Sequence, residues 1–392
     1  MYQPNSLPAP QGLYHPANEH DACGIGFVVN INGEPSHEII LKGIQILINL
    51  THRGACGCDP ETGDGAGVLI QIPHKLFARE CARLGFTLPA PGMYGVGMCF
   101  LPVEPAQRLQ VEGILERIVR EEGLSVLGWR DTPVNVDAIG RIARASQPYI
   151  EQIFVAGAAG MSQDELERRL YVVRKRAESE IAASDLREKS FFYIPSLSTR
   201  TIVYKGLLLA PQIAKFYGEL SDPDAASALC LVHQRFSTNT FPTWQLAHPF
   251  RYICHNGEIN TLKGNVNWMH ARQSILRSDL FGSELQKVFP VVQPNGSDSA
   301  ALDNAVEHAN FRTAEVLFRL ARDRAVLEIR DNGVGFAVHE TEQRFQGGLG
   351  LLLMRYYASQ NGIRLTIHSA RGKGTIVKAT CPVQQAHEAE TI

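Results

Sequence analysis

The order of predicted helices and strands changes near residue 303, and the change lies inside one predicted helix. The stretch SDSAALDNAVEHA, residues 297–309, contains no Pro or Gly and predicts an uninterrupted helix. Domain boundaries usually fall in exposed linkers rich in Pro, Gly or polar residues. The chain is therefore expected to fold as two units that meet within one helix, which is an unusual join.

Length and composition exclude several classes of protein. At roughly 150 residues per domain, 392 residues predict two or three domains. The 44% apolar and 20% charged residues are typical of a globular protein with a sizeable core. The 38 Lys and Arg balance 40 Asp and Glu, for a net charge of −2, so no basic surface for nucleic acid or anionic lipid is predicted. We expect a small-molecule ligand.

Targeting and cysteine signals predict a protein of the reducing cytoplasm. Residues 1–22 lack the basic start and apolar stretch of a secretory signal. The most apolar stretch, residues 39–50, is interrupted by polar side chains and is shorter than the ~20 residues of a membrane span. The eight cysteines are scattered, and only Cys56 and Cys58 lie close together, without a second pair to complete a metal site. We expect these two to be buried packing residues.

The pattern before the join predicts α/β structure with segregated antiparallel sheets. Residues 23–30 are typical of a buried strand, and 37–50 of an amphipathic helix. A loop rich in Gly, Asp and Cys follows at 52–67. The remaining predicted strands are 68–72, 94–101, 201–204 and 228–233, and the remaining helices are 111–122 and 165–183, the latter opened by the capping box Ser162-x-x-Glu165.

The pattern after the join predicts a compact α+β unit with a polar tail from residue 384. Its predicted strands are 314–320, 325–330, 364–369 and 375–381, with a Gly-rich loop and a helix at 349–360 between the second and third.

Cys23 stands at the start of the first predicted strand, after a short polar leader. Removal of residues 1–22 would make Cys23 the amino terminus and place an α-amine beside its thiol. An α-amine titrates near ~8 and can act as a general base, so one residue could supply nucleophile and base. Taken alone, a Cys at a strand start is more often structural.

Many segments in one order resemble a known family. They include LYHPANEHDACGIGFV, THRGA, DPETGDGAG, LGWRDTPV, LVHQRFSTNTFPTWQLAHPFR, HNGEINTLKGNVNWM and GSDSAALDN. Together these resemble the amino-terminal class II glutamine amidotransferase domain of the glutamate synthase large chain, over residues 13–304. The resemblance implies an amino-terminal-nucleophile hydrolase fold, which is a four-layer αββα sandwich, and release of ammonia from the glutamine amide without a cofactor.

The same resemblance assigns the catalytic and substrate-binding residues. It implies that Cys23 attacks the glutamine amide and forms a glutamyl thioester, and that the Asn256 side chain and Gly257 N–H form the oxyanion hole. It also implies that Arg235 pairs with the substrate α-carboxylate. Two charged residues complete the set: Asp298 for the α-ammonium and Arg53 beside the nucleophile, where its charge favours the thiolate.

The second part resembles histidine-kinase-type ATPase domains over residues 304–383. The segments DNAVEHA, DNGVGF, GGLG and GKGT occur in the order of that family's nucleotide-binding boxes. The resemblance implies ATP and Mg²⁺ as ligands, with Asn304 on the metal and Asp331 on the adenine. It further implies glycines that let the backbone approach the nucleotide: Gly333, Gly335, Gly348 and Gly350. Turn glycines between strands are the alternative.

Both resemblances cover incomplete domains, and the chain is interpreted as a chimera. We expect a leader at 1–22, an amidotransferase domain at 23–303 without its carboxyl-terminal part, an ATPase-like domain of partial Bergerat type at 304–383 without its amino-terminal part, and a tail at 384–392. Counterparts of the flavin and iron–sulfur sites of glutamate synthase are absent from this sequence. The predicted function is the glutaminase half-reaction; the alternatives are an ATP-binding module and a non-functional fusion.

Overall fold

The computed structural model of the chain describes a defined set of residues, which fall into two compact units. The described residues are 24–56, 58–235, 241–257, 259, 261–276, 278, 281–293, 296–309, 314–320, 324–331, 358–359, 363–370 and 373–382. The first unit comprises Met1–Asn267, Gln286–Pro290 and Pro294–Ala300, and the second comprises Trp268–Leu285, Val291–Gln293 and Ala301–Ile392.

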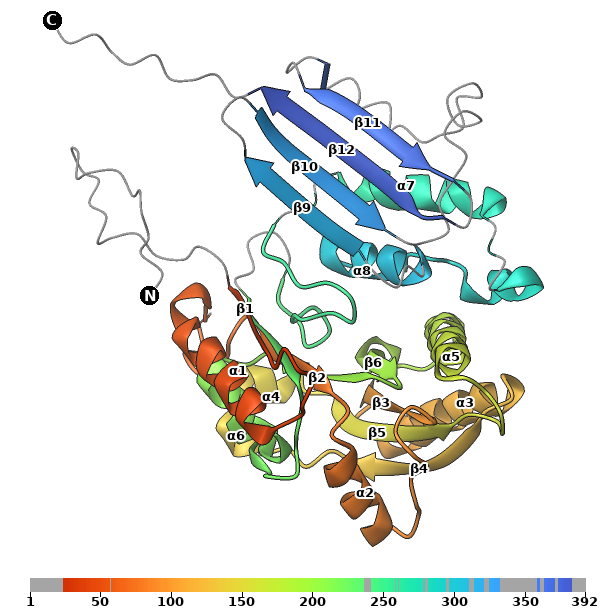
Figure 1. Cartoon of the computed structure of the whole chain (residues 1–392). Coiled ribbons are helices and arrows are strands. Elements are labelled where there is room, and N and C mark those ends of the chain that lie inside the picture. Colours follow the sequence, from red (N-terminus) through yellow and green to blue (C-terminus); the bar gives the residue numbers. More distant parts are fainter. Residues whose placement is uncertain are drawn as a thin grey trace, which may run out of the picture. The chain divides into compact units, whose positions relative to one another are not determined.

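The first unit contains a four-stranded antiparallel sheet in the order β1-β8-β2-β7. Its strands are β1 (Ile25–Val29), β2 (Ala66–Gln71), β7 (Thr201–Gly206) and β8 (Leu229–Gln234). Helix α1 (His37–Asn49) packs on β1 and β8 (Figure 1), and its buried side chains are the apolar residues Ile39, Ile40, Ile44 and Leu47. A Cβ built on Gly43 would lie 2.2 Å from Cys230 Sγ, so only glycine permits this close approach of α1 to β8.

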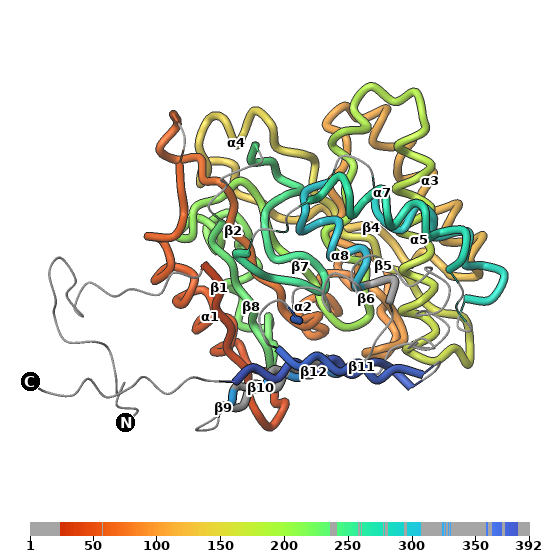
Figure 2. The backbone as a smooth tube through the Cα atoms, turned by 90° about the horizontal axis from the view of Figure 1, so that it is seen from above, coloured from red at the N-terminus to blue at the C-terminus, as the bar shows by residue number. Residues whose placement is uncertain are grey.

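A second antiparallel sheet in the same unit has the order β4-β5-β3-β6. Its strands are β3 (Tyr94–Leu101), β4 (Ser125–Asp131), β5 (Tyr149–Ala156) and β6 (Tyr193–Ser198). Helices α3 (Pro105–Glu121) and α5 (Gln163–Ala183) lie side by side against it (Figures 1 and 2). The predicted cap of α5 is confirmed, since the Ser162 hydroxyl accepts from the Glu165 N–H at 3.2 Å.

The two sheets pack against each other, with β6 and β3 contacting β7. The main core contains buried side chains from both sheets, such as Ile70 of β2, Phe100 of β3 and Tyr204 of β7, and from helix α1. A second core lies between the outer sheet and helices α3 and α5. The layers of the first unit therefore run helix, sheet, sheet, helix. Three shorter helices complete it: α2 (His74–Arg83), α4 (Arg141–Ala145) and α6 (Ile213–Phe216).

Two expectations about burial are wrong. The first strand is not buried: β1 is an edge strand and Phe27 is 66% exposed. A Cβ at Gly26 would meet Ile46 of α1, so the alternate residues Phe27 and Val29 point away from that helix and stay exposed. Cys56 and Cys58 are also exposed rather than buried, because they lie in the loop before β2 and outside the core.

The second unit contains a four-stranded antiparallel sheet in the order β11-β12-β10-β9. Its strands are β9 (Ala314–Leu320), β10 (Arg324–Asp331), β11 (Arg364–Ser369) and β12 (Thr375–Pro382), and Figure 2 shows the sheet nearly edge on. These bounds agree with the four predicted strands to within one residue. Of the helix predicted at 349–360, only residues 358–359 lie within the described part of the chain.

Two further helices, α7 (Leu262–Arg272) and α8 (Asp298–Ala309), each contribute residues to both units. Helix α8 confirms the uninterrupted helix expected at the join. Among the helices that the structure describes, none has the length and apolar character needed to cross a membrane.

Candidate active site

The candidate site lies at the end of β8, where three polar residues follow the apolar part of the strand. His233 pairs with Ile25 of β1 and with Gly67 of β2. The Gln234 N–H donates to the Gly24 carbonyl at 2.8 Å, and the next N–H, of Arg235, donates to the Gly65 carbonyl at 2.8 Å. Cys23 lies outside the described residues, but its covalent neighbour Gly24 lies beside Gln234.

Two glycines allow separate segments to meet at Gln234. A Cβ on Gly24 would lie 2.3 Å from the Gln234 carbonyl oxygen, and a Cβ on Gly54 would lie 2.3 Å from Gln234 Nε2. Neither contact leaves room for a side chain. The backbone next to Cys23 and the backbone next to Arg53 therefore both pack on one residue of β8. Arg53 is half-buried, and its Nε is buried without a hydrogen-bond partner.

Asn256 connects His233 to the backbone of Gly24. Its amide satisfies both neighbours when Nδ2 donates to His233 Nε2 at 2.5 Å and Oδ1 accepts from the Gly24 N–H. In this orientation Nδ2 also faces the His255 carbonyl at 3.3 Å. Asn256 and Gly257 are both exposed, so solvent can reach them. The Asn256 amide thus contacts the backbone N–H of the residue that follows Cys23, and it remains accessible to a small molecule.

Three histidine rings gather around this contact. His233 and His248 are stacked, with ring centroids 4.5 Å apart and an interplanar angle of 25°, and the His255 ring meets His248 edge to face at 5.5 Å. Burial lowers the pKa of His233 to about 4, although its bonds to Asn256 and His255 oppose this. Burial, followed by repulsion from His233, also holds the pKa of His248 well below its usual range. Both rings are neutral at pH 7.

Arg235 is a buried cation with unused hydrogen-bonding capacity. Its side chain is 8% exposed, and Nη1 is buried without a partner. Burial lowers the pKa of Arg235, and the carboxylates of Asp64 and Asp298 oppose that shift. Since a buried donor without a partner costs about 1–3 kcal/mol, the guanidinium is well suited to accept an anionic ligand.

Asp298 is positioned at the first turn of α8 by backbone contacts. Its Oδ2 accepts from the Ile259 N–H at 2.8 Å, and its Oδ1 accepts from the Ser299 N–H at 2.7 Å. Ile259 belongs to the segment HNGEIN that also contains Asn256. The structure therefore links the HNGEIN and GSDS segments, which lie about forty residues apart in sequence, and places the Asp298 charge near Arg235.

The residues predicted to bind a nucleotide are not assembled by the described part of the chain. Asn304 is buried in α8 and takes part in an interaction within the protein. Asp331 ends β10, where its backbone pairs with Ala314 and Thr375. The four glycines, Gly333, Gly335, Gly348 and Gly350, lie outside the described residues.

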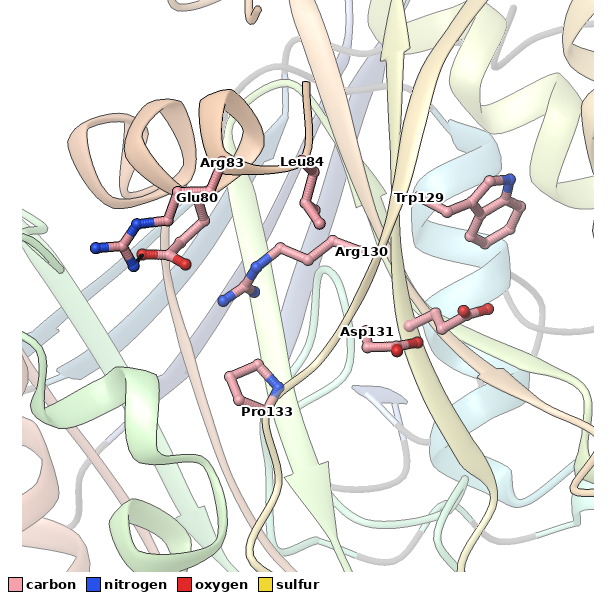
Figure 3. A pocket seen from close by; sticks show the side chains of 8 residues that line it. Glu80, Arg83, Leu84, Trp129, Arg130, Asp131 and Pro133 are labelled. Carbon is pink, nitrogen blue, oxygen red and sulfur yellow. Dashed lines mark hydrogen bonds and ion pairs between the residues drawn. The ribbon is translucent and has the colours of Figure 1, made fainter. Parts of the chain in front are cut away.

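A separate cavity of about 380 Å³ lies between α2 and the β4–β5 edge of the second sheet (Figure 3). It is lined by Glu80, Arg83, Leu84, Trp129, Arg130, Asp131, Pro133 and Glu151. None of the predicted site residues lines this cavity. Its most deeply buried cation, Arg130, donates through Nη1 to Gln152 at 2.7 Å and to Glu219 at 2.6 Å.

Sequence reasoning missed the histidines that surround Asn256. His255 directly precedes Asn256 in the segment HNG, and His233 lies two residues before Arg235 in HQR; this closeness in sequence is the signal that could have identified them. His248 gives no such signal, since only the folded chain brings it onto His233. Asp64, which acts electrostatically on Arg235, stands in the loop at 52–67 that is rich in Gly, Asp and Cys.

Comparison with known proteins decides the family. The family model "Glutamine amidotransferases class-II" matches residues 23–317, which is most of the chain. The chain belongs to the class II glutamine amidotransferases. The match begins at Cys23 and includes every residue of the candidate active site.

Curated relatives of this amidotransferase carry the name glutamate synthase. The chain is 49% identical to the glutamate synthase [NADPH] large chain of Bacillus subtilis over 305 residues, which are 77% of this chain and 20% of the relative. It is 43% identical to the corresponding chain of Azospirillum brasilense, covering 75% and 19%. Identity to ferredoxin-dependent glutamate synthase 2 of Synechocystis is 44%, covering 74% and 18%. The amidotransferase thus spans about a fifth of the length of these relatives.

A second family model overlaps the end of the first. "Histidine kinase-, DNA gyrase B-, and HSP90-like ATPase" matches residues 299–385, as the second resemblance predicts. Among solved structures, a blue-light activated histidine kinase of Erythrobacter litoralis EL346 is matched with a TM-score of 0.18 and 13% identity, over 41% of this chain and 66% of that one. A likeness of this size carries no argument about fold.

Proposed function

We propose that this amidotransferase hydrolyses the side-chain amide of glutamine to glutamate and ammonia through a thioester on Cys23. The observation that carries the proposal is the contact of the Asn256 amide with the Gly24 N–H, one peptide bond from Cys23. This contact supports the proposal that the Cys23 thiol and the Asn256 side chain act on the same amide group of the substrate. The family supports glutamine as the substrate.

The proposed fold of the catalytic domain is the αββα sandwich of the amino-terminal-nucleophile hydrolases. Two antiparallel sheets packed between α1 on one side and α3 and α5 on the other support it. We assign this domain to residues 23–303 and the leader to 1–22. For residues 304–383 we propose a partial Bergerat-type domain, and the antiparallel sheet of β9 to β12 is compatible with it.

Arg235 and Asp298 bind the amino-acid end of glutamine in this proposal. The unpartnered Nη1 of Arg235 receives the α-carboxylate, for which a planar guanidinium is better suited than an ammonium. The Asp298 carboxylate, whose charge already acts on Arg235, receives the α-ammonium. Two opposite charges near each other select a zwitterionic amino acid over a simple amide.

The thiol of Cys23 attacks the amide carbon after loss of the leader. The free α-amine of Cys23 takes the thiol proton, and the sulfur forms a bond to the amide carbon. The Arg53 guanidinium favours the thiolate. As the tetrahedral intermediate collapses, the carbon–nitrogen bond breaks, the α-ammonium returns its proton to the leaving nitrogen, and ammonia departs. Water then attacks the thioester carbon and gives a proton to the α-amine, the carbon–sulfur bond breaks, glutamate departs, and the α-ammonium returns the proton to the Cys23 thiolate.

Asn256 and Gly257 stabilise the negative charge on the substrate oxygen. One of the two Nδ2 hydrogens of Asn256 faces the His255 carbonyl at 3.3 Å, a long contact that the oxyanion can replace. The Gly257 N–H belongs to an exposed backbone segment and supplies the second donor. Hydrogen-bond donors stabilise an oxyanion best when they are already held in position. The His233 ring holds the Asn256 amide through the bond from Nδ2 to Nε2, so His233 acts as a positioning residue.

The test is release of glutamate from glutamine by the purified chain, with the amino terminus determined by intact mass. We expect release from chains that begin at Cys23, and none from Cys23→Ala. Cys58→Ala, which changes an exposed thiol, is the matched control and should keep full activity. Activity that survives Cys23→Ala contradicts the proposal, as does processed wild-type chain that releases no glutamate.

ATP binding is not favoured as a second function. Among the residues that the family would use, only Asn304 has a described side chain, and it already takes part in an interaction within the protein. The glutaminase steps proposed above use groups of the chain and water alone. Coupling of the released ammonia to an acceptor, as the names of the relatives imply for those proteins, would need the further four fifths of their length.

A further inference from the structure

Three side chains beside the candidate active site form a cluster of metal-ligand type. A ring nitrogen of His233, a ring nitrogen of His248 and Cys254 Sγ all lie within 4.8 Å of one another. Among biological cations, Zn²⁺ is well suited to a donor set of two imidazoles and one thiolate. Neither the family resemblance nor the proposed hydrolysis gives Cys254 any role.

The dimensions of the cluster are close to those of a zinc site. A cation at the centre of a triangle with 4.8 Å sides lies about 2.8 Å from each corner, whereas bound zinc lies about 2.0–2.3 Å from nitrogen and sulfur. Each ligand therefore needs to move inward by little more than half an ångström. Side-chain rotations of Cys254, which is only half-buried, can supply part of this movement.

The two rings have nitrogen atoms that the protein leaves unsatisfied. His233 is 2% exposed and His248 is 5% exposed, and Nδ1 of each ring is buried without a hydrogen-bond partner. Buried polar atoms of this kind are uncommon and point to a ligand that the protein itself does not provide.

Metal binding at either ring nitrogen of His233 would end the present hydrogen bond between His233 and Asn256. If Nε2 binds the metal, the Asn256 Nδ2 loses its acceptor. If Nδ1 binds the metal, Nε2 must carry the proton, and a donor then faces the Nδ2 donor. Nδ1 is the unpartnered nitrogen of His233, so the second case applies: the Asn256 amide turns, its Oδ1 accepts from the Nε2–H of His233, and it gives up the Gly24 N–H.

We propose that His233, His248 and Cys254 form a binding site for a borderline-soft divalent cation, with Zn²⁺ as the cation that fits best, and that occupation of this site turns Asn256 away from Gly24. The fourth position of such a site is left for water. The consequence for catalysis rests on the proposed function: a bound cation removes the oxyanion donor and inhibits the glutaminase. The binding itself does not depend on that function.

Cobalt spectroscopy tests the binding. Co²⁺ is titrated into the full chain carrying Cys23→Ala, so that the nucleophile cannot contribute a thiolate. We expect a near-ultraviolet thiolate-to-cobalt band with the strong visible absorption of a tetrahedral site. Adding Cys254→Ser should abolish the near-ultraviolet band, whereas adding Cys58→Ser, the exposed control, should leave it unchanged. His248→Gln should weaken Co²⁺ binding at least ~10-fold. The proposed site is refuted if the Cys23→Ala chain shows no thiolate-to-cobalt band, or if the band survives Cys254→Ser.

Zinc inhibition tests the consequence for catalysis. Zn²⁺ should inhibit glutamate release by the wild-type chain reversibly, with recovery on addition of EDTA. Cys254→Ala, compared with its own metal-free rate, should need at least ~10-fold more Zn²⁺ for the same inhibition. Equal sensitivity of the two proteins overturns the link to Asn256. A cobalt band in a chain that never releases glutamate refutes the proposed function and leaves the metal site standing.

Discussion

Arg235 carries the clearest functional information of any single residue in this chain. A buried guanidinium normally uses its five donors, yet here Nη1 has no partner and the side chain is 8% exposed. The carboxylates of Asp64 and Asp298 oppose the lowering of its pKa by burial. A protein that keeps an incompletely bonded cation in this position gains most when an anionic ligand completes the bonding.

Replacing Arg235 by lysine should therefore weaken glutamine binding more than it slows the chemical step. Loss of the planar fork removes a charge-assisted hydrogen bond worth about 1.5–3 kcal/mol, which predicts a fall of roughly 10- to 100-fold in kcat/KM, mainly through KM. Steady-state glutamate release measures both constants. Arg200→Lys, at an exposed ion pair with Asp164, is the matched control. An unchanged KM for glutamine in Arg235→Lys would show that Arg235 does not bind the substrate.

Asn256→Asp separates the two tasks proposed for this side chain. A carboxylate can still accept the Gly24 N–H but can no longer donate to the substrate oxygen. We expect kcat to fall by about 100- to 1000-fold, as for other single oxyanion donors, while KM changes little. The intact mass should still show an amino terminus at Cys23. If Asn256→Asp keeps most of the wild-type kcat, the side chain positions Gly24 and is not an oxyanion donor.

The residues that assemble this site were predictable to different degrees. Arg235 and Asn256 stand in long, distinctive segments, so that resemblance identified them. His233 and His248 form a stacked pair although they lie fifteen residues apart in the sequence, and no local pattern specifies such a contact. Cys56 and Cys58 were wrongly expected to be buried, since the small size of cysteine says nothing of whether its loop packs on the core.

At the scale of elements, a buried polar network ties the two sheets of the first unit together. Glu219 accepts from Arg130 at 2.6 Å, from Gln152 at 2.8 Å and from Tyr204 at 2.6 Å. These partners belong to β4, β5 and β7, so a single carboxylate joins strands from both sheets. The mutual position of the sheets, and with it the position of β8 in the site, depends on this network.

Glu219→Ala should destabilise the protein strongly. The substitution leaves the buried Arg130 cation without its countercharge, a change that costs about 3–5 kcal/mol in comparable buried pairs. Urea unfolding followed by circular dichroism measures the loss. Glu38→Ala, which breaks an exposed ion pair with Lys42, serves as the control and should leave the midpoint nearly unchanged. Similar midpoints for the two variants would mean that the network does not hold the sheets.

Glu151 in β5 makes stability depend on pH. Burial, together with the nearby Glu112 and Asp131 carboxylates, raises the pKa of Glu151 to about 9. The folded chain therefore holds a proton that the unfolded chain releases near 4.5. The associated stability is complete below that pH and is lost as pH rises toward 9, by at most about 1.4 kcal/mol per pH unit.

Glu151→Gln should remove this dependence, because the amide has the shape of the protonated acid and does not titrate. The difference in unfolding free energy between variant and wild type should grow in favour of the variant from pH 6 to pH 8.5. Urea titrations at several pH values measure it. A constant difference across that range would show that Glu151 is not protonated in the folded protein.

Elements with a clean local signal were predictable, and elements that owe their form to tertiary contacts were not. Residues 94–101 and 364–369 match β3 and β11 at both ends. Strand β5 was missed because its apolar run is interrupted by Glu151 and Gln152, which are both buried, Gln152 with a bond from Arg130 of β4. Strand β4 was missed because Gly128 and a register irregularity beside it break the alternation. Strand β1 was predicted, but its edge position depends on sheet order.

At the scale of the whole molecule, the join inside α8 makes the first unit depend on a helix that it shares with the second unit. Asp298, at the first turn, belongs to the first unit, whereas residues 301–309 belong to the second. Asp298, which we propose binds the substrate, is thus part of a helix most of whose length lies in the other unit.

Calorimetry on the full chain should therefore show two transitions of which only one responds to a substrate mimic. A glutamine-analogue electrophile that reacts with Cys23 stabilises the unit to which it binds, and it should raise the melting temperature of that transition alone. Cys23→Ala should show the same two transitions without the shift. ATP with Mg²⁺ is the matched ligand for the other unit, and a shift of the second transition would support the nucleotide-binding alternative. A single transition that moves as a whole would mean that α8 couples the two units into one cooperative fold, so that losing the second unit would abolish glutamine binding as well.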